Sequence, residues 1–164
     1  MAIQMRQALV EDRNTVLAFH RALYEQHRAA LMEERLGLLY AYRRFPQVLE
    51  EDVDAMLRNP ATAILLAEEH EGDEVRPIGY ITGYIENDPR RVLSRKGVVG
   101  DWYVDESERG AGHGKRLLEA LLSIFRESGC SISEIATWPF NTATRTFIES
   151  AGFDEVQIVY RQKL

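Results

Sequence analysis

The segment Arg109–Lys115 (RGAGHGK), with three glycines among five successive residues, is the part of the chain best suited to bind a ligand. Glycine lets a backbone approach a ligand closely and adopt left-handed conformations. The segment lies between an apolar run that ends at Val104 and a helical pattern that begins near Lys115. The first turn of a helix has unpaired N–H groups and the positive end of the helix dipole, so it binds anions. This order of elements predicts a loop that holds a phosphate group.

The spacing of the glycines excludes two common phosphate-binding motifs. A nucleotide-binding P-loop has glycine five positions before its Gly-Lys pair and Ser or Thr after it. Arg109 and Arg116 occupy those two positions here. A dinucleotide fingerprint has the spacing G-x-G-x-x-G within a strand–helix–strand unit, whereas this loop has G-x-G-x-G. An ordinary glycine turn before a helix is the remaining alternative.

The loop resembles the acetyl-CoA site of the Gcn5-related N-acetyltransferases, the GNAT family. The family's loop reads R/Q-x-x-G-x-G/A, and Arg109, Gly112 and Gly114 match it. The preceding segment Trp102–Asp105 is similar to the end of the family's splayed fourth strand.

A second family signature lies further along the chain. Asn141 is followed eleven residues later by Gly152-Phe153, at the distance from the loop that the family shows. The specific likeness covers residues 98–160, and the chain also resembles the family in length and order of elements.

The resemblance implies how acetyl-CoA is held. The pantetheine arm would bind between the fourth and fifth strands through the backbone of Trp102 and Val104. Backbone N–H groups from Arg109 to Gly114 would hold the pyrophosphate, and Asn141 would contact the arm or cap its own helix. The cofactor-binding residues predicted in this way are Trp102, Tyr103, Val104, Arg109, Gly110, Ala111, Gly112, His113, Gly114, Lys115 and Asn141.

Acetyl transfer to an amine needs a group that takes the proton of the amine and a group that supports the departing thiolate. The family commonly has a tyrosine as the acid seven residues after the asparagine, and Ile148 stands there instead. Tyr103 is the catalytic candidate for this role, and Asp101 is the candidate base. Further alternatives are Tyr84, Thr146, Ser150 or a water molecule for the acid, and Glu86 for the base.

Composition restricts the class of protein. The chain has 164 residues, which predicts one domain over 1–164, and a net charge of −6, which disfavours nonspecific binding to nucleic acid. With one cysteine and four histidines that lack the spacing of metal ligands, we expect no metal site. We also expect a cytoplasmic protein without a membrane segment. A homodimer is compatible with the sequence.

Acidic residues are concentrated in the first third of the chain. They favour either a cationic amine as the acceptor or a simple solvated helix face. The residues concerned are Glu33, Glu34, Glu50, Glu51, Asp52 and Asp54.

Hydrophobic periodicity predicts an α/β fold with a mixed sheet, and the family resemblance implies that this fold is of the GNAT type. An antiparallel meander and a parallel pair of fourth and fifth strands should form a mixed central sheet flanked by helices. Strands are expected at 3–8, 61–67, 78–86, 98–104, 132–137 and 153–163, with helices near 16–31, 45–59, 115–128 and 141–151.

Two functions are consistent with these patterns. One is an N-acetyltransferase that moves an acetyl group from acetyl-CoA to the primary amine of a small molecule or peptide. The cluster Asp101–Val104 also resembles that of aminoglycoside acetyltransferases. The other is a non-catalytic acyl-CoA-binding sensor or regulatory module, which Ile148 favours. The acceptor pocket is expected from residues 20–45 and 86–97.

Overall fold

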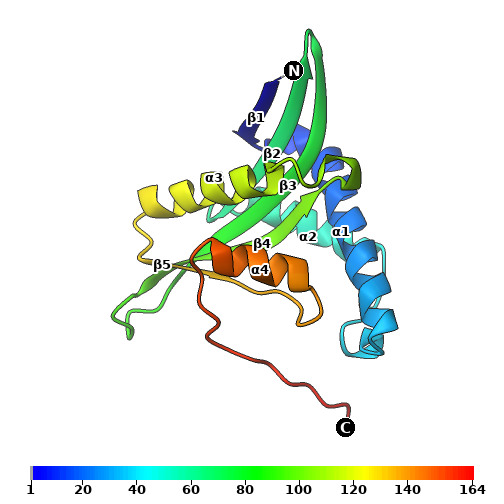
Figure 1. Cartoon of the computed structure of the whole chain (residues 1–164), viewed down its shortest axis with the longest axis vertical. Helices are drawn as coiled ribbons and strands as arrows, with labels where there is room; N and C mark the ends of the chain where they lie inside the picture. The colour runs from blue at the N-terminus through cyan, green and yellow to red at the C-terminus, as the bar shows by residue number, and fades with distance from the viewer. Residues whose placement is uncertain (1) are drawn as a thin grey trace.

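Five strands form one mixed sheet in the order β1-β2-β3-β4-β5, in a computed structural model that describes residues 2–164 (Figure 1). The first four strands pair antiparallel with their neighbours, and β5 runs parallel to β4. This confirms the predicted fold class. The elements in chain order are β1 (Ala2–Gln7), α1 (Arg13–Glu33), α2 (Gln47–Arg58), β2 (Thr62–Glu71), β3 (Glu74–Asn87), β4 (Arg95–Val104), α3 (His113–Glu127), β5 (Ile132–Ile135) and α4 (Thr142–Ser150).

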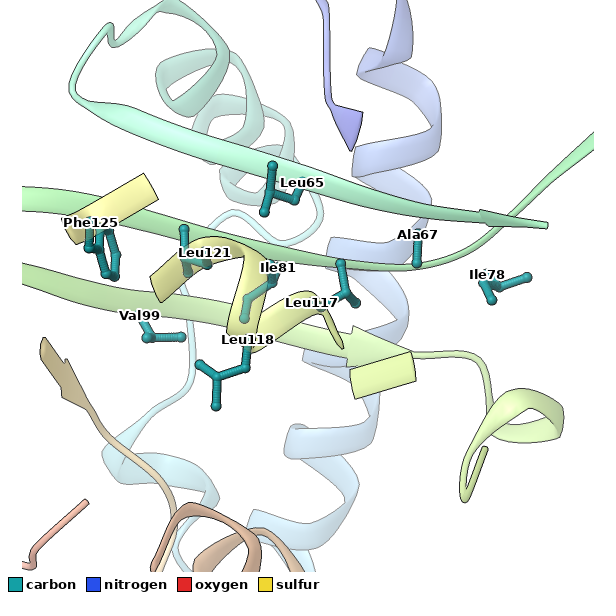
Figure 2. Close-up of a cluster of buried hydrophobic side chains, with 9 residues drawn as sticks. All are labelled: Leu65, Ala67, Ile78, Ile81, Val99, Leu117, Leu118, Leu121 and Phe125. Atoms are coloured by element: carbon teal, nitrogen blue, oxygen red, sulfur yellow. The ribbon is translucent and has the colours of Figure 1, made fainter. Parts of the chain in front are cut away.

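Helices cover both faces of the sheet. Leucines of α3 pack with Phe125 on one face, where they meet apolar side chains of β2, β3 and β4 (Figure 2). Val16 and Phe19 of α1 and Val53 of α2 pack on the other face, against Leu66 and Tyr80. Strand residues therefore alternate between two apolar layers, as expected for a sheet buried on both sides.

The predicted closing strand at 153–163 is wrong. Within residues 2–164, the chain after α4 is extended coil that forms no part of the sheet (Figure 1). Arg145 pairs with Glu155 at 2.9 Å, and a nitrogen of Arg161 donates to the Leu39 carbonyl at 3.1 Å. The first contact ties the start of the segment to α4, and the second ties its end to the connection between α1 and α2. Within the described residues no strand pairs with the segment.

Candidate active site

The fourth and fifth strands separate at one end of the sheet. Their pairing runs from Lys96–Ile132 to Val99–Ile135, and β4 then continues to Val104 without β5 beside it. A cleft of about 770 Å³ lies at this opening. Of the predicted site residues, those that line it are Asp101, Trp102, Tyr103, Val104, Arg109, Gly110, Gly112, His113, Gly114, Lys115 and Asn141. The loop, the end of β4 and the start of α4 therefore meet in one cavity.

The glycine loop ends in a left-handed residue at the start of α3. Gly112 has φ +85° and is the N-cap, and Gly110 has the same φ. A Cβ atom built on either glycine comes within 4 Å of no atom in residues 2–164, so backbone conformation rather than crowding requires glycine there. At Gly114 the reason is different, because a Cβ would lie 3.1 Å from the Trp102 ring. The first turn of α3 thus borders the cleft, with no side chain at Gly112 or Gly114 to keep a ligand from its backbone.

Arg109 connects the loop to two other elements. Its Nε donates to the Val104 carbonyl of β4 at 2.9 Å, and another nitrogen donates to the Gln26 amide oxygen of α1 at 2.9 Å. Its guanidinium also lies 5.5 Å from the centre of the Tyr103 ring. The side chain therefore positions the loop, and it occupies the carbonyl of Val104. Gln26 was missed from the sequence, where nothing in its surroundings distinguishes it from other polar helix residues.

Asn141 caps α4, with its side-chain oxygen accepting from the Thr144 N–H at 3.3 Å. Two apolar residues follow on this helix. Phe147 lines the cleft and packs against Trp102, with ring centres 5.2 Å apart. Ile148, at the family's tyrosine position, is buried with 8% exposure. Neither side chain can donate a proton.

A β-bulge places Asp101 at the cleft. Between the pairs Ile81–Trp102 and Gly83–Val99, β4 contains one residue more than β3. The hydroxyl of Thr82 accepts from the Asp101 N–H at 2.8 Å and so fills the gap in the ladder. Bulges are common next to active sites because they redirect side chains. The side chain of Asp101 is 30% exposed.

His20 of α1 lies between two carboxylates. Its Nδ1 is 3.1 Å from Asp101 Oδ2 and 3.2 Å from the Tyr80 hydroxyl, and its Nε2 is 3.5 Å from Asp52 Oδ2. Burial alone would lower the pKa of His20, but hydrogen bonds and charges of Asp101 and then Asp52 outweigh it and raise this pKa. Burial and the charge of Asp101 raise the pKa of Tyr80 well above its ordinary value. These contacts could not be predicted from the sequence, because the partners of His20 come from three other elements.

Two of the alternative residues, Tyr84 and Glu86, lie elsewhere on the sheet, whereas Thr146 and Ser150 lie on α4. Tyr84 and Glu86 pair with Val98 and Lys96, on the part of β4 that β5 still covers, and Glu86 forms an ion pair with Lys96 at 3.1 Å. Tyr103 lines the cleft, and burial followed by the charge of Asp105 raises the pKa of its hydroxyl. Asp101 and Tyr103 are therefore better placed than Glu86 and Tyr84 for chemistry in the cleft.

The acidic stretch of α2 divides into groups that pair with arginine and one group that faces His20. Asp54 binds Arg13 at 2.6 Å, and Glu51 binds Arg44 at 3.1 Å. Asp52 instead faces His20. Most of the acidic stretch is thus offset by neighbouring arginines. The acidic residues that line the cleft are Asp101 and Glu108, and Glu108 pairs with Arg76 at 2.8 Å.

The structure allows a prediction about pH and stability. Because the folded-state pKa of His20 is raised above its ordinary value of about 6.5, the protonated ring stabilises the fold at low pH, and this contribution is lost as pH rises through the folded-state pKa. The free energy of unfolding of wild type minus that of His20→Gln should therefore decrease with rising pH, in urea titrations across the neutral range.

His27→Gln is the matched control, with the opposite sign. Burial lowers the pKa of His27, so its contribution is present at high pH and is lost as pH falls. If the difference in free energy of unfolding between wild type and variant changes with pH in the same direction for both variants, the ion pair assigned to His20 is contradicted.

Comparison with known proteins agrees with this geometry. The model of the acetyltransferase (GNAT) family matches residues 16–153, so the chain belongs to this family. No significant match is found among proteins of curated function.

Three solved structures illustrate the likeness of fold. AAC(6')-Iy in complex with the bisubstrate analogue CoA-S-monomethyl-acetylneamine is 19% identical with a TM-score of 0.75, and all of both chains is covered. A Trypanosoma brucei acetyltransferase is 22% identical with a TM-score of 0.67, covering 99% of this chain and 100% of that one. A ribosomal-protein-alanine N-acetyltransferase from Brucella melitensis biovar Abortus is 17% identical with a TM-score of 0.69 and the same coverage. At these identities the likeness shows the fold.

Two further features of the described chain bear on its class. None of the helices in residues 2–164 combines the length and apolar character needed to cross a bilayer. In the same residues, no three His, Cys, Asp or Glu side chains are grouped as metal ligands.

Proposed function

We propose that residues 1–164 form a single N-acetyltransferase domain that moves an acetyl group from acetyl-CoA to a primary amine of a small molecule or peptide. One observation carries the proposal: the glycine loop at the start of α3 and the carboxylate of Asp101 line the same cleft, beside the gap between β4 and β5. The reaction needs both groups in one cleft, because the helix end binds the phosphates of acetyl-CoA and the proton acceptor serves the amine at the other end of the pantetheine arm.

The cleft fits acetyl-CoA. The first turn of α3, after Gly112, offers its N–H groups to the pyrophosphate, while the uncovered edge of β4 offers backbone groups near Trp102 to the pantetheine arm. Arg109 keeps the loop against β4. Lys115 also lines the cleft and adds positive charge near this loop.

Asp101 is the proposed base. The amine nitrogen attacks the thioester carbon, the bond from that carbon to sulfur breaks, and the carboxylate of Asp101 takes the proton of the amine. His20 holds one oxygen of this carboxylate. A thiolate with a pKa of about 8.5 is a fair leaving group, so the absence of a hydroxyl at Ile148 is compatible with turnover. Tyr103 is the proposed acid if one is needed.

A cationic acceptor is supported by the charges near the cleft. Asp101 lines it and Asp52 contacts the same His20, whereas other acidic groups of α2 pair with arginine. Proteins of similar fold act on different acceptors, an aminoglycoside in one case and a ribosomal protein in another. Both a small molecule and a peptide therefore remain open as acceptors.

A sensor that binds acyl-CoA without turnover is the second candidate. The observation that favours it is the pair Phe147 and Ile148, which leaves this part of α4 without a proton donor.

CoA and acetyl-CoA are expected to raise the melting temperature. A ligand at a hundred times its Kd adds about 2.7 kcal/mol to the stability of the folded state. For a chain of this length that corresponds to a rise of roughly 5–10 °C, measurable by differential scanning fluorimetry.

Differential scanning fluorimetry and a turnover assay together distinguish the enzyme from the sensor. Release of CoA with any member of a panel of amines supports the enzyme, and stabilisation by CoA without release supports the sensor. If millimolar CoA and acetyl-CoA both leave the melting temperature unchanged, neither proposal holds.

A further inference from the structure

One face of α1 connects the candidate base to an aromatic part of the cleft. His20, Leu23 and His27 follow one another at helical spacing, so their side chains share a face of the helix. His20 contacts the carboxylate of Asp101, whereas Leu23 and His27 line the cleft themselves. Two turns of helix rise roughly 10 Å, so His27 lies about that far along α1 from the residue that holds the carboxylate.

Trp138, in the connection between β5 and α4, completes this part of the cleft. Its ring meets the His27 ring edge-on with centres 6.0 Å apart, and the Tyr40 ring edge-on at 4.5 Å. Trp138 and His27 both line the cleft, and we term these two residues the aromatic wall. Burial lowers the pKa of His27, so its ring is neutral at neutral pH. The wall is therefore flat and uncharged.

The aromatic wall lies on the α1 side of the cleft, apart from the rings beside the glycine loop. Trp102 and Phe147 pack with each other against the layer of α3, and a Cβ at Gly114 would meet the Trp102 ring. Trp138 instead contacts α1 and the connection that follows it, and α1 also holds Asp101. The wall and the carboxylate thus flank the acceptor, whereas Trp102 and Phe147 flank acetyl-CoA.

The charges of the cleft suit an acceptor with one amine. Asp101 and Glu108 are the acidic residues that line the cleft within residues 2–164, and Glu108 pairs with Arg76 at 2.8 Å. Asp101 is therefore the lining carboxylate without an arginine partner. A polyamine or an amino sugar with several ammonium groups would need more than one such carboxylate to offset its charge.

We infer, on the basis of the proposed function, that the acceptor is an arylalkylamine, a small primary amine with an aromatic ring on a short carbon chain. Its nitrogen would lie at Asp101 and its ring against Trp138, with Leu23 between the two. Aromatic rings pair favourably in stacked and edge-on arrangements. The hydroxyl groups of a sugar would instead lie against the wall without hydrogen-bond partners, at a cost in binding.

A comparison of amines tests this class of substrate. The value of kcat/KM for 2-phenylethylamine should exceed the values for spermidine and glucosamine by about tenfold or more, because each of these leaves polar groups unpaired at the wall. The matched control compound is 2-cyclohexylethylamine, which has the same chain and a ring of similar bulk without π electrons. Its kcat/KM should be about 2–12-fold lower than that of 2-phenylethylamine, the usual contribution of an aromatic pair.

Variants of Trp138 test the wall itself. Trp138→Leu should raise KM for 2-phenylethylamine by about 2–12-fold and leave KM for acetyl-CoA unchanged, whereas Trp138→Phe keeps a ring and should stay close to wild type. Trp102→Leu is the matched variant on the other side of the cleft. It should show the reverse pattern, with KM raised for acetyl-CoA and not for the amine. Circular dichroism checks that each variant is folded.

Two outcomes would overturn the inference while acetyl transfer stands. One is a spermidine or glucosamine that is acetylated better than 2-phenylethylamine. The other is a Trp138→Leu variant in which KM for 2-phenylethylamine is unchanged, or rises no more than KM for acetyl-CoA.

The proposed function fails separately, if no amine releases CoA. Calorimetric titration of 2-phenylethylamine into the complex with CoA then decides the inference. Binding that weakens in Trp138→Leu supports an arylalkylamine site, and absence of binding overturns it.

Discussion

Asp101→Asn is expected to lower kcat by about 10²–10⁴-fold, the usual cost of losing a general base. Asparagine keeps the size of the side chain and an oxygen that can accept from His20, so the cleft should keep its shape. Stabilisation by CoA should therefore equal that of wild type. Steady-state kinetics with the amine identified in the panel provide the measurement.

The kinetic pattern distinguishes a base from an anchor for a cationic amine. A base affects kcat, whereas an anchor chiefly raises KM for the acceptor. Asp52→Asn is the control, because Asp52 contacts the other nitrogen of the same imidazole at 3.5 Å. This variant removes the same charge beside His20 but leaves the carboxylate of Asp101 unchanged, so kcat should stay near that of wild type. A wild-type kcat in Asp101→Asn would eliminate Asp101 as the base.

Gly112→Val should abolish stabilisation by CoA while the protein stays folded. Gly112 has φ +85°, and a left-handed conformation costs other residues about 1–2 kcal/mol. Valine would move the loop out of this conformation and place a branched side chain on the approach to the N–H groups of α3. Melting curves with and without CoA measure the effect.

Gly72→Val is the matched control for backbone strain. Gly72 lies in the turn between β2 and β3 with φ +61°, and within the described chain a Cβ there also meets no atom within 4 Å. Both variants should lose stability for the same reason, but Gly72→Val should keep the full shift with CoA. Loss of the shift in both would show that general destabilisation, not the loop, removes binding.

Local signals explain which parts of the fold were predictable. The helices near 16–31 and 115–128 have apolar stripes of helical period, and the structure confirms both as α1 and α3. The glycine loop could be predicted for the same reason, because the residues that define it are adjacent in the sequence. β2 and β3 extend to Glu71 and Glu74, beyond the expected bounds, because the polar ends of this hairpin are held by pairing and not by burial.

Contacts between distant segments explain the rest. His20 and Asp101 are far apart in sequence, and their ion pair depends on how α1 crosses β4. The same holds for Arg109 and Gln26. The prediction of a strand at 153–163 failed for a related reason. Alternation predicts which side chains of a strand share a face, but it does not predict whether a partner strand lies within reach.

The extra residue in β4 also reverses which side chains face which layer. Before the bulge, Val99 packs toward α3 in the layer that contains Leu117. After it, Trp102 packs toward α3, whereas Tyr103 packs with Phe19 of α1. Odd-numbered positions thus change sides at the bulge. A β4 of regular spacing would turn the carboxylate of Asp101 into the apolar layer under α3, so the chemistry of the cleft depends on the number of residues in this strand as much as on their types.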